Sequence, residues 1–138
     1  MEKRKFTDNK IYQGEEKNGR FEGFGILFNG NEKYEGEFRN SLKSEKGIYY
    51  YSNGDRYEGE WKHNLMNGKG NFYSNGNRFE GLWKNGVKTG KANVYYENGT
   101  YEEREYLDGK RHGVWRLRNT NGEVRKRLYE FGKFLGDL

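Results

Sequence analysis

The sequence lacks cysteine and proline altogether, and apolar residues make up only 31% of its 138 residues. Without cysteine the chain has no disulfide bridge, no thiolate metal ligand and no thiol nucleophile, and the absence favours a reducing compartment. No stretch approaches the roughly 18 apolar residues of a membrane-spanning helix, and the N-terminus lacks the apolar segment of a secretory signal. We therefore expect a cytoplasmic protein.

Charge and hydropathy alone would indicate a disordered chain, because 34% of the residues are charged and the mean hydropathy is −1.34. Aromatic residues argue against disorder, since they make up 17% of the chain. They also recur at intervals of 22 or 23 residues, which indicates an internal repeat. The repeats begin at Tyr12, Tyr34, Tyr57, Phe79 and Tyr101.

Glycine supplies two further landmarks in each repeat. The first is a Gly-x-Gly motif, complete or eroded, at Gly23 and Gly25, Glu45 and Gly47, Gly68 and Gly70, Gly90 and Ala92, and Gly113 and Trp115. The second is an Asn-Gly pair, at residues 29–30, 53–54, 75–76, 98–99 and 121–122. Asn-Gly between alternating segments predicts a tight type I′ hairpin turn. Each unit is therefore predicted to be a strand, a loop, a second strand and a tight turn.

Strand geometry explains why aromatic residues and glutamates alternate in the segment "YEGEW", residues 57–61. Tyr57 and Trp61 point to one face of a strand with the glycine between them, while Glu58 and Glu60 point to the other. One face of the sheet is thus predicted to be aromatic and glycine-rich, and the other charged and wet.

The length of the loop within a unit sets which residues face one another. A six-residue loop over residues 63–68 would place Trp61 opposite Gly70 in the return strand. A two-residue turn at the following Asn-Gly pair would then place Phe72 opposite Phe79. Because a flat ring over a cross-strand glycine restores packing, we expect rings to cover the glycines and a side chain at Gly70 to displace Trp61.

The units "YEGEWKHNLMNGKGNFYSNGNR" and "FEGLWKNGVKTGKANVYYENGT" resemble MORN repeats, the membrane occupation and recognition nexus family. The shared pattern is an aromatic-Glu-Gly start, a Trp or Phe two residues on, and a later Gly-x-Gly. The resemblance covers about residues 11–138 and implies an all-β fold. The expected architecture is an elongated, single-layer, twisted antiparallel sheet of about five to six β-hairpins, with no α-helical domain.

The resemblance also divides the chain. Residues 1–10 would form an N-terminal lead-in, residues 11–123 the repeat array, and residues 124–138 a C-terminal capping strand or partial repeat. The C-terminal third departs from the pattern, because Glu103 and Arg104 stand where a glycine is expected. The strand register of the last repeats is therefore left open.

The sequence offers no catalytic, metal or cofactor site. The only histidines, His63 and His112, fall in the variable loops of their repeats, which favours a role as turn residues. Glu58 and Glu60 recur with the repeat, as solubilising charge on a sheet face does. No phosphate-loop motif and no cluster of metal ligands is present. We expect a non-enzymatic protein without cofactors.

Binding remains, with three classes of partner. A protein-protein scaffold is favoured, and the resemblance implies a structural subunit of a eukaryotic cytoskeletal or ciliary assembly, such as an axonemal radial spoke. The alternative is a tether to an anionic phospholipid membrane, and nucleic acid ranks last. Partner contact is predicted at the exposed edges of the aromatic face, at Tyr34, Phe38, Tyr57, Trp61, Phe79 and Trp83.

Positive charge gathers near the C-terminus, where residues 104–133 hold nine Lys or Arg and four Asp or Glu and account for the net charge of +5. Within this segment we predict a basic cluster of Arg116, Arg118, Arg125 and Arg127. A two-residue turn at Asn121-Gly122 would set Arg118 opposite Arg125 and Arg116 opposite Arg127 on the polar face. Alternatively, Glu103 and Glu105 flank Arg118 and Arg116, or a bulge brings Lys126 opposite Arg118 while Arg125 and Arg127 turn away. In each case the cluster is expected to dock an acidic partner protein.

Overall fold

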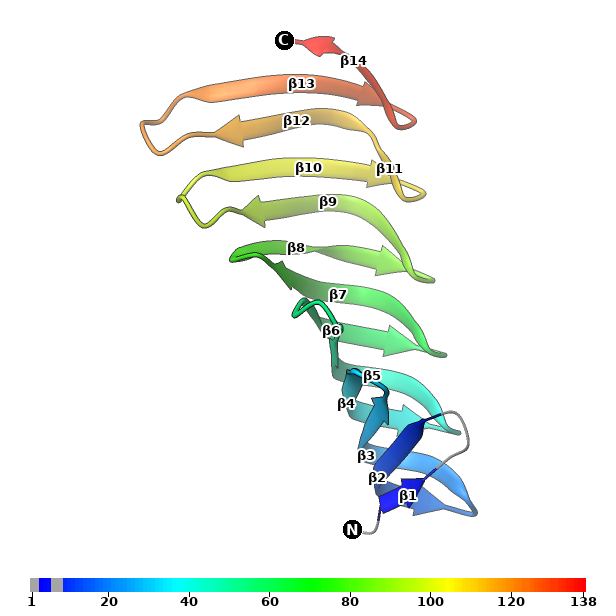
Figure 1. The fold of residues 1–138 in the computed structure, drawn as a ribbon. Helices are drawn as coiled ribbons and strands as arrows, with labels where there is room; N and C mark the ends of the chain where they lie inside the picture. The colour runs from blue at the N-terminus through cyan, green and yellow to red at the C-terminus, as the bar shows by residue number, and fades with distance from the viewer. Residues whose placement is uncertain (1–2, 6–8) are drawn as a thin grey trace.

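The computed structural model describes residues 3–5 and 9–138, and within these ranges it contains fourteen strands in one antiparallel sheet and no helix (Figure 1). Strand order in the sheet follows the sequence, except that β11 pairs with β10 beside β12. The predicted all-β, single-layer architecture is thereby confirmed. The strands are β1 (Lys3–Lys5), β2 (Lys10–Lys17), β3 (Arg20–Asn29), β4 (Glu32–Arg39), β5 (Leu42–Tyr50), β6 (Arg56–Lys62), β7 (Leu65–Ser74), β8 (Asn77–Lys84), β9 (Val87–Tyr95), β10 (Tyr101–Leu107), β11 (Lys110–Arg111), β12 (Gly113–Arg118), β13 (Val124–Glu130) and β14 (Lys133–Asp137).

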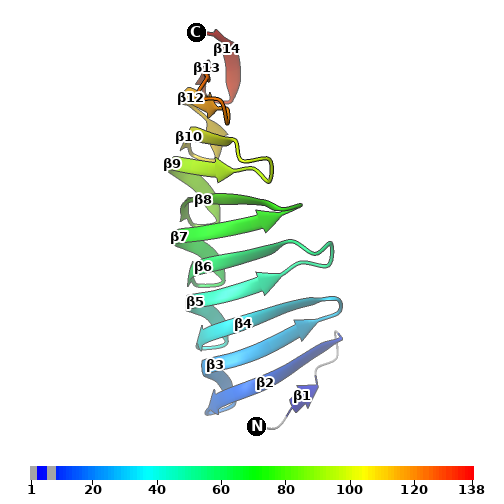
Figure 2. The same cartoon turned by 90° about the vertical axis from the view of Figure 1, so that its left-hand side faces the viewer.

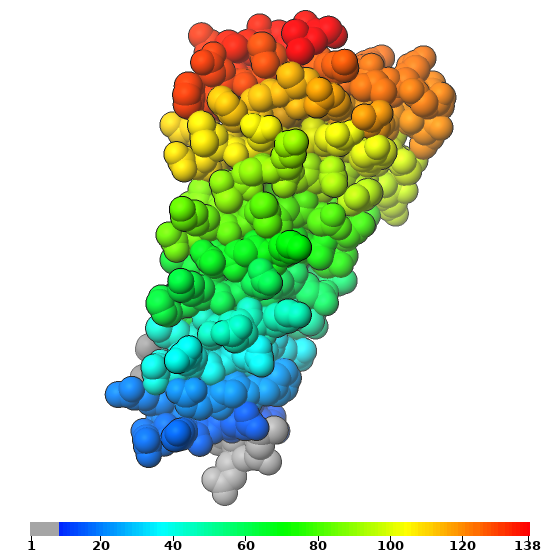
Figure 3. All heavy atoms as spheres, turned by 180° about the vertical axis from the view of Figure 1, so that it is seen from behind, coloured from blue at the N-terminus to red at the C-terminus, as the bar shows by residue number. Residues whose placement is uncertain are grey.

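The sheet is long and twisted, with the two termini at opposite ends (Figures 1 and 2). Strands of the C-terminal half run across the view in Figure 1, whereas strands of the N-terminal half run across it in Figure 2. The right-handed twist of each strand accumulates into this rotation along the array. A space-filling view from behind has the same elongated outline (Figure 3).

Each repeat contains a two-residue type I′ turn between its two strands, where we predicted a longer loop. His63 and Asn64 have φ values of 49° and 69°, as a type I′ turn requires. The predicted six-residue loop over residues 63–68 is wrong, because residues 65–68 already belong to β7. Turns with the same pair of positive φ values lie at Asn18-Gly19, Asn40-Ser41, Asn85-Gly86, Asp108-Gly109 and Phe131-Gly132.

The Asn-Gly pairs between repeats adopt three kinds of turn. At the first pair, Asn29 ends β3 opposite Glu32, and the two-residue turn is Gly30-Asn31, in which only the glycine has positive φ. Asn75-Gly76 forms the predicted type I′ turn, with φ values of 51° and 79°. Asn53-Gly54 lies instead in a longer turn, in which the Tyr51 N–H donates to the Asp55 carbonyl over 2.9 Å and the glycine alone has positive φ. Equivalent hydrogen bonds close the turns at residues 96–100 and 119–123. The longer turn adds one residue and therefore changes which side chains oppose each other.

The tight turn within each repeat and the register shift that follows it together set glycine opposite glycine, and not opposite tryptophan as predicted. Gly70 pairs with Gly59 on one side and with Gly81 on the other. We call this line, which continues across seven consecutive strands, the glycine row. Its members are Gly14, Gly25, Gly36, Gly47, Gly59, Gly70 and Gly81.

Tyrosine rings cover the glycine row. A Cβ atom at Gly70 would lie 2.4 Å from the hydroxyl oxygen of Tyr57, so the ring occupies the space of a side chain. The hydroxyl donates to the Glu60 carbonyl over 3.1 Å, which fixes the ring in place. The tyrosines that open the first two repeats make the same contact. Rings do cover the glycines, but the ring over Gly70 belongs to Tyr57 and not to Trp61.

A bulge in each repeat explains the first glycine of the Gly-x-Gly motif. The register between β6 and β7 shifts between Gly59 and Trp61, and Gly68 has a φ of 106° that favours glycine. At this break in the ladder, the Glu60 carboxylate accepts the Lys69 N–H over 2.7 Å. The first glycine of the motif thus permits the bend, and the second makes room for the tyrosine ring.

The core is a continuous line of rings on the face of the glycine row. Trp61 packs edge-on against Tyr34 and Tyr57, at centroid distances of 5.4 and 5.2 Å. Phe72 lies opposite Phe79, as predicted. A single layer buries one face only by curving around it, and the strands curl accordingly (Figure 1). The buried residues are Tyr12, Phe21, Tyr34, Phe38, Tyr57, Trp61, Phe79, Trp83, Ala92, Val94, Tyr106, Trp115 and Tyr129.

Candidate functional site

The six aromatic residues predicted to contact a partner are core residues. Tyr57 is 0% exposed, and Phe79, with the largest exposure among the six, is 8% exposed. Their expected exposure at the edges of the face is wrong, because the sheet curls around them. The structure brings all six into one cluster that a partner cannot reach while the core is intact: Tyr34, Phe38, Tyr57, Trp61, Phe79 and Trp83.

A second line of side chains on the same face is half-buried and reaches the surface. Tyr51 lies between Tyr49 and Phe72, at centroid distances of 4.8 and 5.7 Å. Cross-strand pairing explains this line, because Tyr49 lies opposite both Tyr34 and Tyr57 and continues their row on the second strand of its repeat. We call these side chains the aromatic strip. It consists of Leu27, Tyr49, Tyr51, Phe72 and Tyr96, which lie toward the turns between repeats, and of Met66, which lies opposite Trp61 beside the turn within its repeat.

Our sequence reasoning missed the aromatic strip, although a signal for it was present. Aromatic residues gather just before the turns between repeats, in "YYY" at 49–51, "FY" at 72–73 and "YY" at 95–96. Strand alternation sends neighbouring rings to opposite faces. On the polar face, the Arg56 guanidinium lies over the Tyr73 ring, with Cζ 3.8 Å from the ring centroid. Such runs therefore supply rings to both faces, and one set forms the strip.

Two lysines lie among the rings beside the aromatic strip. Lys43 Nζ is 5.5 Å from the ring centroids of both Tyr49 and Trp61, and Lys88 Nζ is 4.4 Å from that of Phe79. Burial lowers the pKa of both amines from the ordinary value. Cation–π contacts of this kind hold the ammonium groups over the rings. The aromatic strip therefore has a positively charged border.

The register of the basic cluster differs from the arrangements that we predicted. The turn at residues 119–123 contains one residue more than a two-residue turn and shifts β13 accordingly. Arg116 consequently lies opposite Lys126, and Arg118 lies opposite Val124. The predicted pairs of opposed arginines are wrong, and so is the alternative that placed Lys126 opposite Arg118.

This shift divides the four arginines of the basic cluster between two faces. Arg125 and Arg127 share the face of the core rings, whereas Arg116 and Arg118 lie on the polar face. The part of the alternative in which Arg125 and Arg127 turn away is therefore confirmed. Arg118 Nε pairs with Glu103 Oε1 at 2.6 Å, so one flanking carboxylate is placed as an alternative predicted. The end of the array is thus basic on both faces.

Arg104 replaces a glycine of the repeat and fills the space that a tyrosine ring covers elsewhere. Its guanidinium lies 4.6 Å from the Trp115 ring and pairs with Glu102. It also donates to the hydroxyls of Tyr96 and Tyr106, over 3.0 and 3.1 Å. This network joins the aromatic strip to the last repeats, and it accounts for the departure from the repeat pattern at this position.

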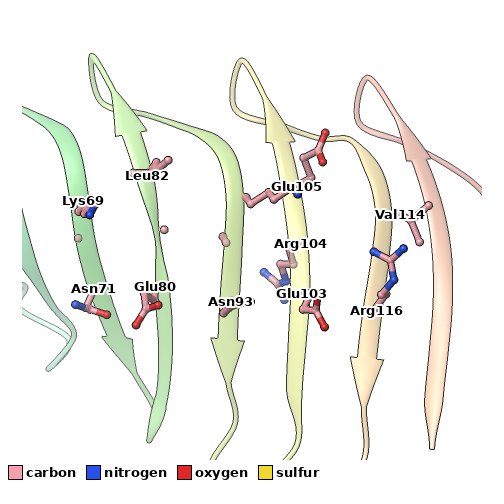
Figure 4. A pocket seen from close by; sticks show the side chains of 14 residues that line it. Lys69, Asn71, Glu80, Leu82, Asn93, Glu103, Arg104, Glu105, Val114 and Arg116 are labelled. Carbon is pink, nitrogen blue, oxygen red and sulfur yellow. The ribbon is translucent and has the colours of Figure 1, made fainter.

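The polar face carries an open groove of about 720 Å³ across β7 to β12 (Figure 4). Lys69, Asn71 and Glu80 line it, together with their counterparts in the next repeats. His63 is an exposed turn residue, and His112 packs against Phe131, at a centroid distance of 5.4 Å. No group of three potential metal ligands occurs within the described residues. Charged groups and amides of this kind can recognise a polar partner.

Comparison with known families agrees with this geometry. The family model described as "MORN repeat" matches residues 12–31, 34–56, 57–78 and 79–101. These matches cover more than half of the chain and follow its strand-turn-strand units. The chain therefore belongs to the MORN repeat family, a class of non-catalytic repeat modules. A search of curated proteins gave no match. No helix among the described residues is long and apolar enough to cross a membrane.

Proposed function

We propose that this protein is an interaction scaffold, which holds other proteins along the aromatic strip as a structural subunit of a cytoplasmic cytoskeletal or ciliary assembly. The observation that carries the proposal is the strip itself. Its half-buried rings extend along the array beside Lys43 and Lys88. Apolar side chains with a charged border are typical of surfaces that bind proteins. Membership of a non-catalytic repeat family agrees with a binding role.

The strip can be tested with a matched pair of variants. Leu27→Ser with Tyr51→Ser removes apolar surface from the strip. Tyr50→Ser with Tyr73→Ser removes half-buried rings from the polar face of the second and third repeats. We expect the strip variant to lose the proteins that co-purify with the wild-type chain from its own cells, and the polar-face variant to retain them. Loss of partners from the polar-face variant alone would contradict the proposal.

The basic cluster supports a second contact, with an acidic protein surface. Arg125 is exposed, Arg116 lies on the other face, and exposed guanidinium groups bind carboxylates in a salt-dependent way. Replacing Arg116, Arg118, Arg125 and Arg127 with Gln should weaken docking of a glutamate-rich peptide at low salt and leave circular dichroism unchanged. Equal binding of the peptide would contradict this contact. Stronger binding of the wild-type chain to anionic phospholipid vesicles than to the peptide would favour the membrane tether.

A further inference from the structure

The two long edges of the sheet carry opposite charge. One edge consists of the type I′ turns within the repeats, each taken with the residue before and the residue after it. We call it the basic rim, and it follows the right-hand side of Figure 1. It holds seven cationic residues against two acidic ones, Asp108 and Glu130. The cations are Lys17, Arg20, Arg39, Lys62, Lys84, Lys110 and Lys133.

The opposite edge, which we call the acidic rim, consists of the turns between the repeats. These turns lie at residues 29–32, 51–55, 74–77, 96–100 and 119–123. They contain no Lys or Arg and four acidic residues, Glu32, Asp55, Glu97 and Glu123. A hydrogen bond of 2.6 Å from the Tyr49 hydroxyl lowers the pKa of the Glu32 carboxyl, which keeps it charged.

Neighbouring groups do not cancel either rim. All seven cations of the basic rim are exposed, and none forms an ion pair with another described residue. Lys33, Arg56 and Arg78 lie just inside the acidic rim, but each pairs with a glutamate two residues further along its own strand, at 3.0, 4.0 and 2.8 Å. Lys10, opposite Asn29, is the one cation beside the first of these turns that forms no ion pair with a described residue. Charge is therefore separated across the width of the sheet.

This separation occurs in a segment that is almost neutral as a whole. Residues 1–103 contain 17 Lys or Arg and 16 Asp or Glu, so net charge does not oppose contact between two copies of these repeats. The excess positive charge belongs to residues 104–133. An arrangement that keeps the C-terminal ends of two copies apart would avoid repulsion between them.

We propose that a second copy of this chain docks side by side with the first, with its acidic rim against the basic rim. Both rims present one turn per hairpin, so both repeat at about 9.6 Å, which is twice the spacing of neighbouring strands. Because each rim winds around the axis of the twisted sheet (Figures 1 and 2), two copies meet over a few neighbouring repeats and not along the whole array. Leu65 and Val87, which are 45% and 42% exposed on the basic rim, become covered in this contact.

The contact is heterologous, because two different surfaces meet and each copy keeps one rim free. Repetition therefore adds copies to both sides and gives ribbons instead of closed dimers. Exposed ion pairs are individually weak, and salt screens them over about 10 Å at 0.1 M, so association should be salt-sensitive. Tyr51 and Tyr96 stand where the aromatic strip meets the acidic rim, whereas Leu27, Tyr49, Met66 and Phe72 lie outside both rims and stay free for the partners proposed above.

Two charge-neutral variants and one control test this proposal. The basic-rim variant carries Arg39→Gln, Lys62→Gln and Lys84→Gln. The acidic-rim variant carries Asp55→Asn, Glu97→Gln and Glu123→Gln. A control with Lys46→Gln, Lys69→Gln and Lys91→Gln removes three exposed lysines from the polar face of the same repeats. The measurement is sedimentation equilibrium of the purified chains, from about 10 µM to about 1 mM and at low and high salt.

The mixture of the two rim variants gives the decisive result. At low salt, the average mass of the wild type and of the control should rise with concentration, and each rim variant alone should stay monomeric. Because each rim variant retains the rim that the other lacks, an equimolar mixture should form dimers and nothing larger. A monomeric mixture, a wild type that stays monomeric at low salt, or a basic-rim variant that associates as the wild type does would each overturn the proposal.

Discussion

Gly70→Ala and Tyr57→Phe together test how the glycine row is packed. An added Cβ at Gly70 would lie 2.4 Å from the Tyr57 hydroxyl oxygen and 2.5 Å from ring atom Cε2, so the ring must move. Trp61 and Trp83 pack on that ring, at 5.2 and 5.0 Å, and leave it 0% exposed. Overpacking of this kind should lower the free energy of unfolding by about 2 to 3 kcal/mol. Tyr57→Phe alone should lower it by about 1 kcal/mol, through loss of the hydrogen bond to the Glu60 carbonyl.

The double variant should lose only about 2 kcal/mol, less than the sum of the single losses, because removing the hydroxyl relieves part of the clash. The chain itself contains this combination, since the fourth repeat has Phe79 for the tyrosine and Ala92 for the glycine. Urea unfolding followed by tryptophan fluorescence measures the free energy of unfolding of each single variant and of the double variant. Gly70→Ala combined with Tyr12→Phe, several strands away, should show simple additivity. Additive losses in the Tyr57→Phe double variant would refute this account of the glycine row.

Four further changes should follow from the structure. Glu45→Gly should raise the free energy of unfolding, measured in urea, by about 1 kcal/mol, because Glu45 has a φ of 59° that glycine adopts without strain. A lower free energy of unfolding in this variant would contradict the prediction. Glu60→Ala should cost about 1 to 2 kcal/mol in the same assay, because its carboxylate accepts a backbone N–H, whereas Glu58→Ala should change stability by less than about 0.5 kcal/mol. Arg104→Leu should cost about 2 kcal/mol, because two tyrosine hydroxyls lose their donor. Stability should also fall as the pH rises from 10 towards 12, since burial raises the pKa of Tyr12 from 10.0 to about 12 and the phenol ionises first in the unfolded chain. Tyr12→Phe should make this fall less steep in a pH titration followed by circular dichroism, and part of the fall should remain because burial also raises the pKa of Tyr34 and Tyr57.

The fold could be predicted from the sequence because the same motifs recur in every repeat. Aromatic-Glu-Gly starts at a fixed interval, with strand alternation, predicted the ring face, the polar face and the pairing of Phe72 with Phe79, all of which are confirmed. Turn lengths could not be predicted from the sequence, because Asn-Gly fits more than one turn type and because His63-Asn64 forms a type I′ turn without any glycine. An error of four residues in the loop after Trp61, and of one residue in the turn at residues 119–123, changed which residues oppose each other, including Arg116 and Arg118.

The candidate site was harder to predict than the fold. Alternation assigns a side chain to a face, but it does not say how far the sheet curls around that face. Tyr57 and Trp61 were therefore placed correctly and yet expected to be exposed, whereas they are 0% and 7% exposed. The bulge at Gly68 bends the strands around the ring face. The Glu60 carboxylate accepts a hydrogen bond at this bulge, although we assigned Glu60 to solubility. The opposite charges of the two rims could not be predicted from the sequence, because they depend on which residues form the turns.

Strand order that follows the sequence has a consequence for synthesis on the ribosome. Every strand after the first finds its earlier partner directly behind it in the chain, so each hairpin can dock as soon as it emerges. No strand waits for a distant segment that has yet to be translated. Apart from the N-terminal edge at β1, the edge open to faulty pairing during growth is thus the newest strand, and each added hairpin covers the one before it.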